Sequence, residues 1–243
     1  MVTLEQHITS FVDRLRAAHG DNLNSVLVYG GAATREATSA ATGARTLVVL
    51  DRLRASDLRA AHDAVAEWIA TGNPPPVMMS ADEIQSSRDV FPIEFLDLAD
   101  NRRIVHGADP FDGLDVSPRH LRFQVEFELR GKLIRLRELY LVSSGDTDRI
   151  VRLLVESLGT FGKLFRFALR LVGEHGPRSR VDALRAGIRH FELDADPFDR
   201  ILDVLTDDAT IASEDVHRIF ADYLAQIERV IDVVDKIPES YPA

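Results

Sequence analysis

The sequence contains no cysteine among its 243 residues. Disulfide bonds, thiolate nucleophiles and cysteine-ligated zinc sites are therefore excluded. Long apolar runs are also missing, since no stretch reaches the roughly 18 residues that a membrane-spanning helix needs. The first residues, MVTLEQHITSF, have neither a basic segment nor an unbroken apolar core, which does not fit a secretion signal. We therefore expect a cytoplasmic protein with no membrane partner.

Positive charge is scarce relative to negative charge. The chain carries 29 Lys and Arg against 39 Asp and Glu, a formal net charge of −10. Because an acidic surface repels a phosphate backbone, we do not expect a nucleic-acid partner. The eight histidines include no i, i+4 pair of the kind that binds zinc on a helix, so they predict no metal site. With 45% hydrophobic residues, the chain can bury a core in one or two domains.

Residues 1–110 alternate between helical and strand patterns. A capping-box motif at residues 3–6 (TLEQ) opens a first helix, and Ser56 is the expected cap of another helix that runs to Thr71. Short apolar runs, several of them rich in β-branched residues, predict strands at 25–29, 46–50, 77–79, 92–98 and, at an edge, 103–107. The sequence therefore predicts an α/β domain with a small mixed sheet over residues 1–110.

The pattern changes after residue 110. Residues 108–118 contain two Pro, one Gly and three Asp, a composition typical of a linker. After Val116 no strand pattern recurs, and helical periodicity covers residues 120–142, 148–174, 180–191, 198–205 and 213–236. We therefore predict a second domain over residues 116–238, an all-α bundle of antiparallel helices.

Two segments of the first domain suggest a family. The sequence Val28-Tyr29-Gly30-Gly31 ends the first predicted strand, and the sequence TLVVL at residues 46–50 forms the second. Together they resemble the signature of the nucleotidyltransferase superfamily, which has the DNA polymerase beta-like or minimal nucleotidyltransferase fold. In that signature a strand ends in Gly-Ser and the next strand opens with Asp-x-Asp. The resemblance implies this fold, followed by the helical bundle, with Gly30, Gly31 and Thr34 in the remnant of a nucleotide-binding turn.

The signature has a plain physical basis. A Gly-Ser turn lets backbone amides approach a triphosphate closely, and the serine hydroxyl adds a donor. The two Asp of Asp-x-Asp point to the same side of a strand because side chains alternate. With a third carboxylate from a neighbouring strand they hold two Mg²⁺ ions, which clamp the attacking and leaving oxygens of the transferred nucleotidyl group.

This sequence departs from the signature at the metal ligands. The serine is replaced by Gly31, and the two Asp positions align with Gly43 and Arg45. No acidic residue occurs between Glu36 and Asp51, and Asp51 lies about 13 Å too far along the strand. A fixed positive charge at Arg45 also repels a cation. We therefore predict that the chain has no metal site and no catalytic residues.

The predicted fourth strand supplies acidic residues that could complete a site. Glu94 is the best match to the third carboxylate, and Asp97 is the second. Arg45 either contacts a phosphate in place of a metal or, in the interpretation that the sequence favours, pairs with Glu94 or is solvated. The predicted nucleotide-binding remnant thus consists of Gly30, Gly31, Thr34, Arg45 and Glu94.

Three functions are consistent with this sequence. The leading hypothesis is a nucleotidyltransferase-like protein with a degenerate active site, without catalytic activity or cofactor, that binds a ligand or partner in its cleft. The second is an active Mg²⁺-dependent nucleotidyltransferase that uses Glu94 and Asp97 on a small-molecule or protein acceptor. The third is an antitoxin-like regulatory module whose bundle binds a partner chain. A nucleotide or other small molecule, a protein partner and a second copy of the chain are the partners left open.

Overall fold

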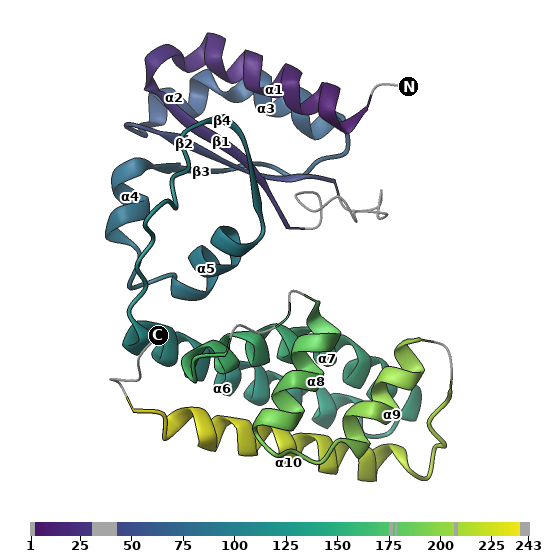
Figure 1. Cartoon of the computed structure of the whole chain (residues 1–243). Helices are drawn as coiled ribbons and strands as arrows, with labels where there is room; N and C mark the ends of the chain where they lie inside the picture. The colour runs from purple at the N-terminus through teal and green to yellow at the C-terminus, as the bar shows by residue number, and fades with distance from the viewer. Residues whose placement is uncertain (1–2, 31–42, 175–176, 178, 207–208, 239–243) are drawn as a thin grey trace. The chain divides into compact units, whose positions relative to one another are not determined.

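The computed structural model describes residues 3–30, 43–174, 177, 179–206 and 209–238. The chain divides into two compact units, residues 1–116 and residues 117–243. The first unit contains a sheet with short helices, and the second contains longer helices (Figure 1). The predicted fold class, an α/β domain with a small mixed sheet followed by an all-α bundle, is confirmed.

A four-stranded mixed sheet is the centre of the first unit, with strand order β3-β2-β1-β4. The strands are β1 (Leu23–Tyr29), β2 (Arg45–Leu50), β3 (Val77–Ser80) and β4 (Arg102–Gly107). β1 pairs antiparallel with both β2 and β4, whereas β2 pairs parallel with β3. All four strands fall on apolar runs that predicted them, and β4 lies at an edge as expected.

Helices cover both faces of this sheet: α1 (Leu4–His19), α2 (Ala55–Ala60), α3 (His62–Ala70), α4 (Ala81–Ser86) and α5 (Pro92–Asp100). α2 and α3 replace the single helix predicted at residues 56–71. α1 and α3 lie over one face, where Phe11 stacks on Trp68 with ring centroids 4.7 Å apart (Figure 1). Ile84 of α4 and Phe95 of α5 belong to the core on the opposite face. Because β1 and β2 are buried on both faces, they contain continuous apolar runs at residues 26–28 and 47–50.

The segment at residues 92–98 is a helix, and the prediction of a fourth strand there was wrong. Pro92 lies in the first turn of α5, where the missing N–H costs no hydrogen bond. The buried residues of α5 are spaced as on a helix and do not alternate: Pro92, Ile93, Phe95 and Leu96. As a consequence, Glu94 and Asp97 lie about one turn apart on α5 and are not on a strand of the sheet.

The second unit is a helical bundle of α6 (Pro118–Ser143), α7 (Thr147–Leu171), α8 (Arg180–His190), α9 (Asp196–Leu205) and α10 (Val216–Asp235). α7 contacts each of the other four helices and has more buried residues than any of them. Its Phe165 packs edge-on against Phe191 and Phe198. Within the described ranges, no helix is long and apolar enough to cross a membrane.

The two glycines of α7 give a matched test of this packing. An added Cβ at Gly162 would lie 2.8 Å from the backbone oxygen of Arg180, whereas at Gly159 it would meet only the Arg180 guanidinium, at 3.8 Å. We expect Gly162→Ala to lower the free energy of unfolding by about 1–3 kcal/mol, because α8 must move. Gly159→Ala should raise it by about 0.5–1 kcal/mol through helix propensity. Urea denaturation measures both values, and equal effects would contradict the close contact between α7 and α8.

Candidate functional site

Three polar side chains lie in one row across the sheet, where β1 ends and β2 begins. Tyr29 is paired with Arg45 on β2 and with Arg102 on β4. Strand alternation places them on the same face as Leu27 and Leu47, which belong to the core beneath α4 and α5. The row therefore lies at the border of this core, at the end of the sheet where the resemblance puts the nucleotide.

Tyr29 and Arg45 differ in their surroundings. Partial burial raises the pKa of the Tyr29 phenol; the positive charge of Arg45 opposes this shift, and the negative charge of Asp97 adds to it. The phenol is therefore protonated at neutral pH and can donate a hydrogen bond. Arg45 is exposed, and its side chain makes no hydrogen bond or ion pair with any other residue that the structure describes.

Arg102, by contrast, is held by protein groups. Its Nε lies 2.9 and 3.0 Å from the two carboxylate oxygens of Asp109, and its guanidinium also donates to the carbonyl oxygen of Ala99. Its Cζ is 5.7 Å from the centre of the Phe111 ring. Partial burial raises the pKa of Asp109, but hydrogen bonds from Arg102 and from the Phe111 amide lower it further than burial raises it. Of the two arginines in the row, Arg102 is the one whose donors are used by groups that the structure describes.

Gly43 precedes β2 in a backbone conformation that disfavours a larger residue. Its φ is +65°, and an added Cβ would lie 2.6 Å from the backbone oxygen of Gly72 and 2.8 Å from the Cα of Asn73. The buried Asn73 side chain accepts a hydrogen bond from the Ala44 amide at 2.7 Å and donates to the Thr71 hydroxyl at 2.8 Å. The start of β2 is therefore fixed against this turn, and an Asp cannot replace Gly43 unless the turn moves.

These residues do not fit the pair of Mg²⁺ ions that the fold implies. The position aligned with the first Asp is a glycine without room for a side chain, and the position aligned with the second is Arg45, whose charge repels cations. Glu94, the best sequence match to the third carboxylate, is exposed on α5. In the part of the chain that the structure describes, no three His, Cys, Asp or Glu residues are grouped so that they could hold a metal ion.

The predicted binding residues are only partly accounted for. Gly31 and Thr34 lie outside the described residues. Gly30 follows the last residue of β1 with a φ of +72°, and its N–H donates to the carbonyl oxygen of Asn101 at 3.1 Å. This amide is therefore already used within the protein. The strand prediction placed Glu94 on the sheet beside Arg45. Glu94 instead lies in the first turn of α5.

Asp97, the second choice from sequence, acts electrostatically on Tyr29 of the row. It raises the pKa of Tyr29, and its Oδ1 accepts a hydrogen bond from the Asn101 side chain at 3.2 Å. Sequence reasoning missed Tyr29 and Arg102 as members of the site. Counting alternate residues from Leu27 would have placed Tyr29 on this face, but Arg102 precedes the strand predicted from residue 103.

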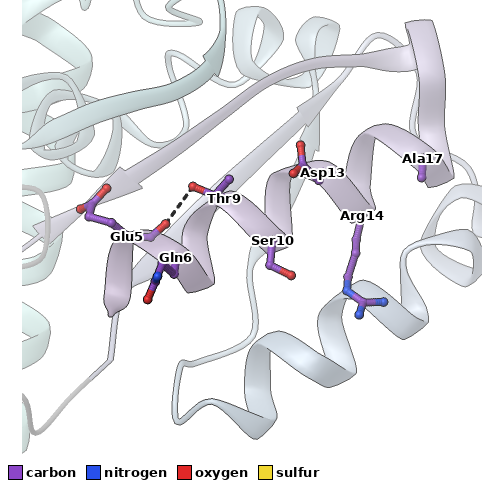
Figure 2. Close-up of a pocket in the computed structure, with 7 residues that line it drawn as sticks. All are labelled: Glu5, Gln6, Thr9, Ser10, Asp13, Arg14 and Ala17. Atoms are coloured by element: carbon purple, nitrogen blue, oxygen red, sulfur yellow. Dashed lines mark hydrogen bonds between the residues drawn. The ribbon is translucent and has the colours of Figure 1, made fainter. Parts of the chain in front are cut away.

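A hollow of about 670 Å³ lies elsewhere in the first unit, along the outer side of α1. Its lining comes from this single helix: Glu5, Gln6, Thr9, Ser10, Asp13, Arg14 and Ala17 (Figure 2). The Thr9 hydroxyl donates to the Glu5 carbonyl oxygen at 2.9 Å, within the helix. Because the convex surface of one helix cannot enclose a ligand, we interpret this hollow as a solvated helix face.

Comparison with known proteins defines the class of fold. No family model matches the chain, and no curated protein matches it. Among solved structures, the chain is similar to the spectinomycin adenyltransferase AAD(9) from Enterococcus faecialis, which was solved with ATP and spectinomycin. The two are 14% identical, the match covers 93% of this chain and 98% of that chain, and the TM-score is 0.52. The chain therefore has the fold of a nucleotidyltransferase, as the resemblance implied.

Alanine substitutions at Gly43 and Gly30 separate two constraints on the site. Both residues have a positive φ, but an added Cβ has nothing within 4 Å at Gly30. We expect Gly30→Ala to lower the free energy of unfolding by about 1–2 kcal/mol through backbone strain alone. Gly43→Ala should lower it by about 1–3 kcal/mol more, because of the overlap with the neighbouring turn. Urea denaturation checks this, and equal losses would show that the turn moves freely.

Proposed function

We propose that this protein is a nucleotidyltransferase-like binding protein that does not transfer nucleotides. The proposal rests on the start of β2, where Gly43 has no room for a side chain and Arg45 carries a positive charge. Two-metal transfer needs carboxylates at these positions to hold the cations that clamp the reacting oxygens. The alternative of an active enzyme based on Glu94 and Asp97 lacks any carboxylate on β2 to complete its metal site.

The ligand that we propose is a nucleotide or another small molecule bearing phosphate, bound without a metal ion. Arg45 can form charge-assisted hydrogen bonds with phosphate oxygens, and the protonated Tyr29 phenol is a second donor beside it. The lack of a described partner for Arg45 supports this interpretation over an ion pair with Glu94. The similar adenyltransferase AAD(9) was solved with ATP, which makes ATP the first probe. A cytoplasmic location remains part of the proposal.

The proposed function predicts that the protein does not transfer a nucleotidyl group to any acceptor tested. Purified protein would be incubated with Mg²⁺ or Mn²⁺, α-labelled nucleoside triphosphates and spectinomycin as one acceptor. We expect neither a labelled product nor pyrophosphate release above a protein-free blank, because the site cannot hold two cations. The adenyltransferase AAD(9) is the positive control. Transfer that disappears in a Glu94→Gln, Asp97→Asn double variant would refute the proposal in favour of an active enzyme.

Binding through Arg45 predicts a thermal shift that does not depend on divalent cations. ATP at 100 times its dissociation constant should stabilise the protein by about 2.7 kcal/mol, and EDTA should leave this effect unchanged. Arg45→Ala should remove most of the shift. Arg52→Ala is the matched control, because Arg52 is an exposed arginine just beyond the other end of β2. A shift that requires Mg²⁺, or equal losses in the two variants, would be incompatible with a metal-free phosphate site.

A further inference from the structure

One of the two arginines in the row has its charge compensated within the protein. The Arg102 Nε lies 2.9 and 3.0 Å from the two carboxylate oxygens of Asp109. The two side chains are only 18% and 30% exposed, so salt screens this pair less than it screens an ion pair at the surface. Together they add no net charge to the site. The other arginine, Arg45, has no ion pair with any residue that the structure describes, and its charge is the one that a ligand can balance.

A negative charge lies close to the same row. Asp97 of α5 acts electrostatically on Tyr29, in the opposite sense to Arg45. Two hydrogen bonds fix its place. The Asn101 side chain donates to the Asp97 Oδ1 at 3.2 Å, and the Asn101 carbonyl oxygen accepts the N–H of Gly30, which follows Tyr29, at 3.1 Å. Each negative charge that a ligand brings beyond the first is therefore repelled by Asp97.

The chain around the site is also acidic. Residues 1–116 contain 10 arginines, no lysine and 17 Asp and Glu, a formal charge of −7. Residues 117–243 contain 19 Lys and Arg against 22 Asp and Glu, a formal charge of −3. These counts cover the whole sequence, so neither unit has an excess of positive charge. Without a metal ion, long-range attraction therefore does not favour a ligand with several negative charges.

We propose that the ligand of this site is a small phosphodiester with a single negative charge, an inference that rests on the proposed function. A phosphodiester has two free oxygens that share one charge, which matches the two parallel N–H donors of one guanidinium. Arg45 balances this charge, and the Tyr29 phenol beside it is a further donor. A phosphomonoester carries close to two charges at neutral pH, and a triphosphate carries more. Arg45 alone leaves these additional charges unbalanced.

The charge of the ligand can be varied on one adenosine scaffold. Isothermal titration calorimetry at about pH 8, with EDTA and at constant ionic strength, would compare adenosine 5′-methyl phosphate, AMP and ATP, which carry increasing negative charge. We expect the methyl ester to bind most tightly and AMP at least about threefold more weakly. Diethyl phosphate distinguishes the sources of a diester: affinity similar to that of the methyl ester indicates a ligand without a nucleoside, and weaker binding indicates a nucleotide diester.

The failure of this inference differs from the failure of the proposed function. If AMP or ATP binds the unmodified protein as tightly as the methyl ester, the single-charge inference is wrong, whereas metal-free phosphate binding stands. If none of the phosphates binds, or if Arg45→Ala binds them as well as the unmodified protein does, the proposed phosphate site itself is wrong.

A variant of Asp109 tests the compensation of Arg102. Asp109→Asn keeps an oxygen acceptor for Arg102 but removes the balancing charge. The preference for the methyl ester over AMP should then narrow by at least about twofold, because Arg102 attracts the second charge. Asp63→Asn is the matched control, since it changes the net charge equally and Asp63 is exposed on α3, over the other face of the sheet. With unchanged circular dichroism spectra, equal narrowing in both variants, or none in Asp109→Asn, would overturn the inference.

Discussion

The hydrogen bond from the Ala44 amide to the buried Asn73 side chain fixes where β2 begins, and the candidate site depends on this placement. It sets Gly43 against the turn that follows α3 and brings Arg45 into register with Tyr29. A buried amide left without an acceptor would cost about 1–3 kcal/mol, so the arrangement is strongly held. This placement leaves no room for a carboxylate at Gly43 and puts the positive charge of Arg45 beside Tyr29, and both features support the proposed binding of an anion without metal ions.

The strands and the bundle could be predicted from sequence because their buried apolar residues follow the spacing that is typical of strands and helices. Residues 47–50 are continuously apolar since the sheet is covered on both faces, and α7 repeats its apolar residues at helical spacing. The apolar pattern at residues 92–98 indicates its secondary structure less clearly. Its seven residues fit a strand and a helix equally by composition, and only the spacing of Ile93, Phe95 and Leu96 with Pro92 in the first turn decides for the helix. Short segments of this kind need tertiary contacts to settle them.

The site was predictable only in part, for a different reason. The sequence located Gly43 and Arg45 as the positions that depart from the family signature, because that comparison is local. It could not reveal that Gly43 lies against the backbone of Gly72, since the contact joins segments about thirty residues apart in the chain. Nor could it show that Arg102 is held by Asp109 while Arg45 has no described partner. Such differences between chemically identical side chains arise from the fold.

The contact between Gly43 and the neighbouring turn also has an evolutionary consequence. An acidic residue introduced at this position by a single codon change would destabilise the protein before it could contribute to any metal site. A second change, in the turn itself, would have to come first and would offer no advantage alone. If the proposed function holds, stepwise selection would not readily lead such a chain to metal-dependent chemistry. A change in the ligand that the site binds would then be more accessible than a gain of transfer activity.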